Sequence, residues 1–130
     1  MNDDTKDFIS QWIKKAEEDL TVVNKLTEFE IIASSAVCFH CQQAVEKFLK
    51  AFLTAYDKEI VRTHNIEFLL SECSEIDKDF AEIDPENLTD FGVDIRYPGD
   101  FYSPSDDEVK NYIHIAYQIK SLVESKIPKK

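Results

Sequence analysis

Residues 31–56, IIASSAVCFHCQQAVEKFLKAFLTAY, decide the fold. The segment contains no glycine or proline, the residues that most often interrupt helices. Its apolar residues recur at helical spacing and cover a broad face: Val37, Cys41, Ala44, Val45, Phe48, Leu49, Phe52 and Leu53. A helix that is apolar over so much of its circumference belongs at the centre of a helical domain. We therefore predict a long central helix from Ile31 to Tyr56.

A narrow polar stripe runs along the same segment and consists of Gln42, Gln43, Glu46, Lys47 and Lys50. Glu46 and Lys50 are four residues apart in the favourable order, acid before base. We expect this stripe to stay on one side of the central helix.

Cys38 and Cys41 form a C-x-x-C pair, and Cys73 lies further along the chain. A structural zinc site needs four ligands, and a redox pair is expected at a helix N-terminus beside a strand. This pair lies inside an apolar helix instead. We expect all three cysteines to be buried as small hydrophobic side chains, with no metal site.

Other periodic segments predict further helices around the central one. The first runs from Asp4 to Lys25, and a third begins at Thr63 or His64. Asp84-Pro85-Glu86 predicts the start of a short fourth helix that ends before Pro98, at Arg96 or Tyr97. Ser105 and Glu108 match a capping box that opens the last helix.

The chain is therefore predicted to be all-α, an up-and-down helical bundle of four to five helices forming one domain over residues 1–130. Two glycines and four prolines in 130 residues favour a few long helices over many short strands. No apolar run is long enough to span a membrane, and the acidic N-terminal residues do not resemble a signal peptide. An odd number of cysteines argues against a disulfide framework, so we expect a cytoplasmic protein.

The net charge of −11 is concentrated in one part of the chain. Residues 63–110 hold 14 acidic and three basic residues. An extended nucleic-acid-binding surface needs clustered lysine and arginine, so the composition argues against one. The acidic residues are interpreted as solvated surface, with a basic partner surface as the alternative.

No catalytic motif is complete. Two isolated glycines cannot build a phosphate-binding loop. His40, His64 and His114 have no cysteine or serine nucleophile in a recognisable local motif, and His64 is interpreted as a helix cap. Paired carboxylates are expected by chance on so acidic a chain. We therefore assign no catalytic residue, no metal ligand and no cofactor.

Arg96-Tyr97-Pro98 is the segment that most favours a binding site. Arg96 is the only basic residue between Lys78 and Lys110. One interpretation pairs it with the neighbouring Asp94 and Asp100 for structure. The other uses the planar guanidinium for phosphate, with nearby aromatic rings stacking on a base. Residues of the polar stripe on the central helix would add charge and polar contacts. The candidate ligand-binding residues are Arg96, Tyr97, Tyr102, Lys47, Lys50 and Gln43.

Taken together, these motifs resemble the HEPN domain family (higher eukaryotes and prokaryotes nucleotide-binding), in its Arg-Tyr-Pro-containing branch. The matching pieces are Trp12 with the segment 16–20 (AEEDL), residues 40–51 (HCQQAVEKFLKA), Thr63-His64 and Arg96-Tyr97-Pro98. Their order and spacing are preserved over nearly the whole chain. The resemblance implies a helical bundle, usually a homodimer. It also implies pairing with a minimal nucleotidyltransferase in a toxin–antitoxin system.

Many members of the family are metal-independent ribonucleases. Their motif consists of an arginine and a histidine separated by four to six residues. In this sequence Phe101, Tyr102 and Ser103 occupy the positions where that histidine belongs, so the usual acid–base imidazole is missing. The leading hypothesis is a non-catalytic module that binds a nucleotide or phosphorylated ligand, pairs with a nucleotidyltransferase, or does both. The alternatives are a ribonuclease toxin with a degenerate motif and a ligand-free dimerising adaptor.

Overall fold

The computed structural model describes residues 2–92 and 102–128. Its helices are α1 (Asp3–Leu26), α2 (Ser34–Ala55), α3 (Ile66–Ile76) and α4 (Asp106–Lys126). Two short 3₁₀ helices, η1 (Lys78–Glu82) and η2 (Leu88–Phe91), lie between α3 and α4. No strand occurs among the described residues. The all-helical bundle predicted from the sequence is confirmed.

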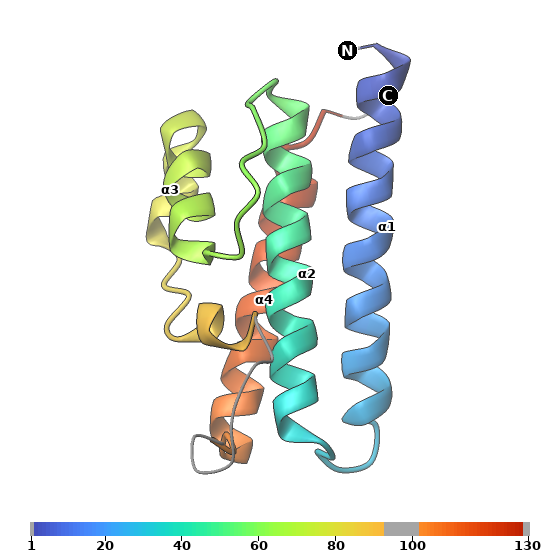
Figure 1. The fold of residues 1–130 in the computed structure, drawn as a ribbon, viewed down its shortest axis with the longest axis vertical. Helices are drawn as coiled ribbons and strands as arrows, with labels where there is room; N and C mark the ends of the chain where they lie inside the picture. The colour runs from blue at the N-terminus through green and yellow to red at the C-terminus, as the bar shows by residue number, and fades with distance from the viewer. Residues whose placement is uncertain (1, 93–101, 129–130) are drawn as a thin grey trace.

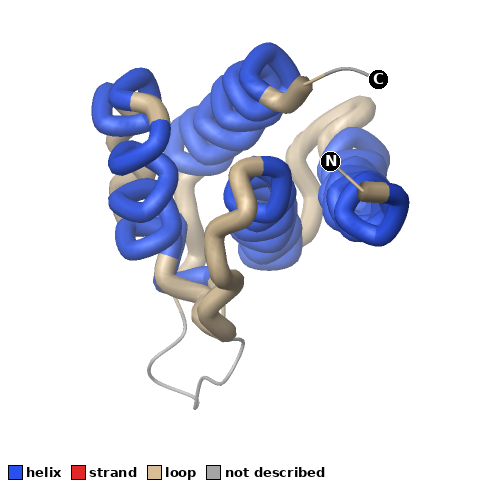
Figure 2. Tube along the Cα trace, turned by 90° about the horizontal axis from the view of Figure 1, so that it is seen from above, coloured by secondary structure: helices blue, strands red, loops and turns tan. Residues whose placement is uncertain are grey.

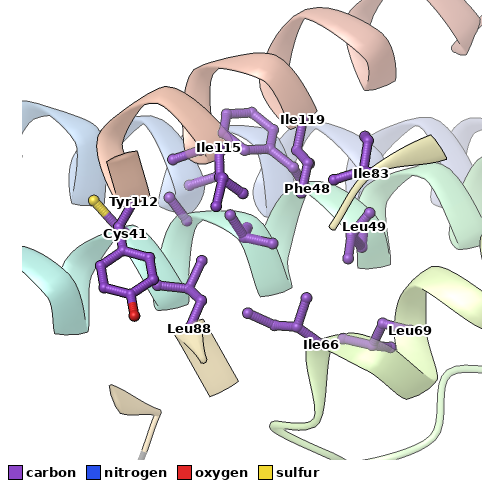
Figure 3. Packing of buried hydrophobic residues seen from close by; sticks show 14 of the residues in the cluster. Cys41, Phe48, Leu49, Ile66, Leu69, Ile83, Leu88, Tyr112, Ile115 and Ile119 are labelled. Carbon is purple, nitrogen blue, oxygen red and sulfur yellow. The ribbon is translucent and has the colours of Figure 1, made fainter. Parts of the chain in front are cut away.

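The central position of α2 is also confirmed. Figures 1 and 2 show α1 and α3 on opposite sides of α2, with α4 behind it. Thirteen of the 22 residues of α2 are buried. In Figure 3, Phe48 and Leu49 of α2 lie between side chains of α4 and side chains of α3, including Ile115, Ile119, Ile66 and Leu69. The broad apolar face of α2 therefore packs against three helices at once.

Three helix starts follow local capping chemistry. Asn2 Oδ1 accepts from the Thr5 amide at the start of α1. At the start of α4, Ser105 Oγ accepts from the Glu108 amide while Glu108 accepts from the Ser105 amide, which confirms the predicted capping box. The predicted start of α3 is wrong by two or three residues, because Asn65 Oδ1 caps the Phe68 amide and the helix begins at Ile66. His64 does not cap this helix.

Two other boundaries differ from prediction. α2 begins at Ser34 rather than Ile31, because Ala33 adopts a left-handed conformation with φ of 51°. In the described part of the predicted fourth helix, up to Gly92, the structure has a 3₁₀ turn at Leu88–Phe91. Pro85 does not start it, since Asp84 Oδ1 binds the Glu86 amide in a turn and Glu86 has φ of 52°. Its predicted end at Arg96 or Tyr97 lies outside the described residues.

Candidate functional site

The polar stripe of α2 is divided between two clusters. In the first, Lys50 Nζ donates to Glu46 Oε1 over 2.8 Å, and both side chains are nearly buried. His64 Nδ1 lies 3.0 Å from Glu46 Oε2. Burial by itself raises the pKa of Glu46, but the hydrogen bonds from Lys50 and His64 outweigh it and hold that pKa below its ordinary value. The Lys50 ammonium also lies 5.5 Å from the centre of the Trp12 ring.

Gln42 extends this first cluster toward the connecting segments. Its Nε2 donates to Glu46 Oε2 over 3.1 Å and to the His64 carbonyl over 3.0 Å. Its Oε1 accepts from Gln43 Nε2 over 2.7 Å. Gln42 is fully buried, so these bonds offset the cost of removing its amide from water. The first cluster thus ties the α2–α3 connection to α2.

The second cluster lies where α1 packs along α2. The two oxygens of Asp19 accept from different residues of α2: His40 Nδ1 at 2.8 Å and Lys47 Nζ at 2.7 Å. The Asp19 side chain is 10% exposed, whereas those of His40 and Lys47 are 27% and 24% exposed. One buried carboxylate therefore holds two partly exposed basic side chains.

The segment that carries Arg96 and Tyr97 lies outside the described residues, but the residues that flank the undescribed stretch are placed. Gly92 is buried, and a Cβ there would lie 2.6 Å from Gln42 Nε2. Tyr102 is half-exposed, its hydroxyl donates to Glu108, and its carbonyl accepts from Ser35 Oγ. Gly92 therefore lies beside the polar stripe of α2, and Tyr102 lies at the start of α4.

A hollow of about 160 Å³ lies beside Tyr102. It is lined by Asn87, Asp90, Phe91, Tyr102, Glu108 and Tyr112. The rings of Phe91 and Tyr112 meet edge to face with centroids 5.4 Å apart, and Figure 3 shows Tyr112 beside Leu88 and Cys41 of the core. The hollow therefore offers aromatic surface together with carboxylate and amide oxygens. These groups suit a ring with N–H donors better than they suit a phosphate.

A wider depression, lined by Ile9, Ile13 and other residues of α1 alone, lies on the outside of the bundle. A second one lies between the start of α1 and the end of α2, around Phe8, Trp12 and Ile60. Neither depression is lined by any of the ligand-binding residues predicted from the sequence, whereas Tyr102 lines the hollow, so we place the candidate site there.

The three cysteines are free and buried, as the sequence predicted. Burial raises the pKa of Cys38 to about 12, with a smaller contribution from Glu108, and burial likewise raises the pKa of Cys73 to about 12. Burial also raises the pKa of Cys41. Among the described residues, no group of three histidine, cysteine or acidic side chains is arranged to hold a metal ion.

The comparison with known families agrees with this architecture. The family model described as HEPN domain matches residues 9–126, which include nearly all of the four α helices. The chain belongs to the HEPN family. Comparisons with curated proteins and with solved structures gave no match. Among the described helices of this HEPN domain, none combines the length and the hydropathy that a membrane span requires.

The six candidate ligand-binding residues of this HEPN domain fall into four groups. Arg96 and Tyr97 lie outside the described residues, and Tyr102 lines the hollow. Gln43 and Lys47 lie on the partly exposed side of α2, and Lys47 is ion-paired with Asp19. Lys50 is buried against Glu46, with 9% of its side chain exposed. Lys50 therefore needs a rearrangement before it can reach a ligand, whereas Lys47 does not.

From the sequence, no ligand-binding role was predicted for His40 or Asp19. His40, Gln43 and Lys47 are spaced i, i+3 and i+7, which places them on one side of a helix and could have grouped them. Asp19 could not be found in this way, because its partners are on another helix. The pairing appears only when α1 packs on α2.

Proposed function

We propose that this HEPN domain binds a nucleotide or a related phosphorylated ligand between the hollow beside Tyr102 and the polar side of α2. The observation that carries the proposal is the placement of Gly92 and Tyr102. Gly92 packs on Gln42, and Tyr102 lines a hollow with the rings of Phe91 and Tyr112. Gly92 and Tyr102, the described residues on either side of the undescribed stretch, therefore both lie beside these groups.

The chemistry of the hollow indicates that the base and the phosphate of the ligand bind at different places. Asp90 and Glu108 contribute carboxylates to the lining, and carboxylates repel phosphate. A carboxylate oxygen can accept a further hydrogen bond, here from the N–H groups of a base, beside those that Glu108 accepts from Tyr102 and Ser105. The Tyr102 ring offers a stacking face. In the proposal, the base occupies the hollow and the phosphate lies toward cationic side chains. Arg96 supplies the planar fork that binds phosphate well.

Protein partners belong to the same proposal. HEPN membership supports a homodimer and pairing with a minimal nucleotidyltransferase in a toxin–antitoxin system. Large apolar side chains at the surface are compatible with a protein contact, notably Phe29 at 94% exposed and Phe8 at 56%. Light scattering of the purified chain, alone and with a co-expressed nucleotidyltransferase, measures both assemblies. If the chain is monomeric and forms no complex with the nucleotidyltransferase, this part of the proposal is contradicted.

Isothermal titration calorimetry with nucleoside mono-, di- and triphosphates tests the ligand. Arg96→Ala is expected to weaken binding about tenfold or more, as loss of a charge-assisted hydrogen bond does. Tyr102→Ala is expected to weaken it by a similar factor through loss of stacking.

Matched controls are available for both variants. Arg62 is the only other arginine and is exposed, so Arg62→Ala controls for charge. Tyr56 is 43% exposed compared with 49% for Tyr102, and it also makes one hydroxyl hydrogen bond, so Tyr56→Ala controls for the ring. Equal binding by Arg96→Ala and the unmodified protein, or no binding by either, contradicts the role of Arg96.

A further inference from the structure

The cluster formed by Asp19, His40 and Lys47 has an unused hydrogen-bonding capacity. Ionised carboxylates only accept hydrogen bonds, so the His40 nitrogen that faces Asp19, Nδ1, must carry a hydrogen. No hydrogen bond to His40 Nε2 is formed within the described residues. The Lys47 ammonium gives one of its three N–H donors to Asp19. Asp19 thus holds both side chains in place. Nε2 of His40 and two N–H groups of Lys47 remain beyond the hydrogen bonds to Asp19.

The charge of the cluster depends on the state of His40. Asp19 from α1 and Lys47 from α2 are the charged groups joined to it, and their charges cancel. With a neutral imidazole, Nε2 is an acceptor and repels an anion. With a protonated imidazole, Nε2 becomes a donor, and the cluster carries one net positive charge.

We propose that His40 and Lys47, held by the same carboxylate, form a phosphate subsite, and that His40 binds the phosphate as an imidazolium. The inference rests on the proposed function, since it names the groups that receive the phosphate of the nucleotide. Gln43 lies between the two residues on the same side of α2 and keeps one amide hydrogen beyond the one given to Gln42. Any fraction of His40 that is neutral before the ligand arrives must take up a proton when the phosphate binds.

The arrangement limits how much the subsite must reorganise. Asp19 is 10% exposed and bonded through both oxygens, so His40 and Lys47 lose little side-chain freedom when a ligand arrives. Their own exposed fractions leave room for a ligand to reach them. Lys50 lacks this access, because its side chain is 9% exposed and bound to Glu46.

Calorimetry in two buffers with different ionisation enthalpies measures the proton uptake. The ligands are adenosine 5′-monophosphate, adenosine and inorganic phosphate. Comparing them shows whether the bound anion is the phosphate of a nucleotide or free phosphate. For the unmodified protein we expect uptake of a fraction of a proton with the nucleotide and none with adenosine. His40→Gln is expected to abolish the uptake and weaken nucleotide binding about tenfold.

His114→Gln is the matched control, because His114 is exposed on α4 and no hydrogen bond engages it among the described residues. Gln at position 40 can still donate to Asp19, and circular dichroism checks that the variant folds. As a second readout, the imidazole ¹⁵N signals of His40, but not those of His114, are expected to shift when the nucleotide is added.

The outcomes separate this inference from the proposed function. Nucleotide binding with the same affinity and proton uptake in His40→Gln overturns the subsite and leaves nucleotide binding intact. Equal affinity for adenosine and its monophosphate also overturns it. If inorganic phosphate binds with proton uptake and as tightly as the nucleotide, the phosphate subsite is supported. The proposal that the ligand is a nucleotide is then contradicted. Absence of binding by all three ligands overturns both.

Discussion

Gly92 packs against the side-chain amide of Gln42, so closely that a Cβ at position 92 would lie 2.6 Å from Gln42 Nε2 and 2.8 Å from its Cδ. Gln42 cannot easily yield, because its amide is fully buried and bonded to Glu46, Gln43 and the His64 carbonyl. The contact joins the start of the Arg96 segment to the central helix.

Gly92→Ala is expected to destabilise the protein by about 1–3 kcal/mol, the usual cost of overpacking a fixed site. The φ of Gly92 is −74°, so backbone strain does not contribute, and the smaller gain from stiffening the unfolded chain does not offset the clash. Chemical denaturation of Gly92→Ala, Gln42→Ala and the double variant measures the effect. If the clash is responsible, Gly92→Ala costs less when Gln42 is already Ala; equal costs in both backgrounds contradict it.

Lys50→Met is expected to destabilise the fold by about 3–5 kcal/mol at neutral pH, because it leaves the buried Glu46 carboxylate without its lysine. Lys15→Met is a suitable control, since Lys15 pairs with Glu18 on the exposed face of α1 and such pairs contribute about 0–1 kcal/mol. Urea denaturation compares the two variants. A similarly small loss of stability in both variants would show that the Lys50–Glu46 pair is not needed for the stability of the fold.

The same pair predicts how stability depends on pH. The pKa of Glu46 in the folded protein is lowered from the ordinary 4.5, despite burial, by Lys50 and His64. A lowered folded pKa stabilises the protein above the unfolded value, and the contribution disappears as pH falls through the folded value. We expect Glu46→Gln to remove part of the stability loss between neutral pH and the region below pH 4.5. An unchanged pH profile in that variant contradicts the assignment.

Ser105→Ala is expected to destabilise the protein by about 1 kcal/mol through loss of the N-cap of α4. Ser121 is exposed within the same helix and forms no hydrogen bond through its side chain among the described residues, so Ser121→Ala is expected to be neutral or slightly stabilising. Thermal unfolding of both variants measures the difference. The capping interpretation does not survive if the two substitutions have the same effect.

Native Cys38 and Cys73 are expected to react very slowly with thiol reagents near neutral pH, because burial raises the pKa of each to about 12 and blocks access. All three thiols should react quickly once the chain is unfolded in denaturant. A chromogenic disulfide reagent counts them in both states. Rapid labelling of the folded protein would contradict the burial of these cysteines in solution.

The sequence alone determined the helical bundle and the central position of α2. Both follow from periodicity, since a helix with apolar residues around most of its circumference must be surrounded. The capping box at Ser105 was predictable for a related reason: its donors and acceptors lie within four residues of each other. The 3₁₀ helix at Lys78–Glu82 and the short turn at Leu88–Phe91 were not, because their conformations depend on how Phe80 and Phe91 reach the core.

For the candidate site, the sequence supplied the residue types but not their partners. It identified Lys47 and Lys50 as equivalent cations one turn apart, yet Lys50 is buried against Glu46 and Lys47 is held at the partly exposed seam with α1. Only the packing of α1 on α2 brought Asp19 to His40 and Lys47, which follow it in the sequence by 21 and 28 positions. Helical periodicity is a property of neighbours along the chain and can be read from it. The pairing of side chains on different helices depends on how those helices pack, which no local pattern specifies.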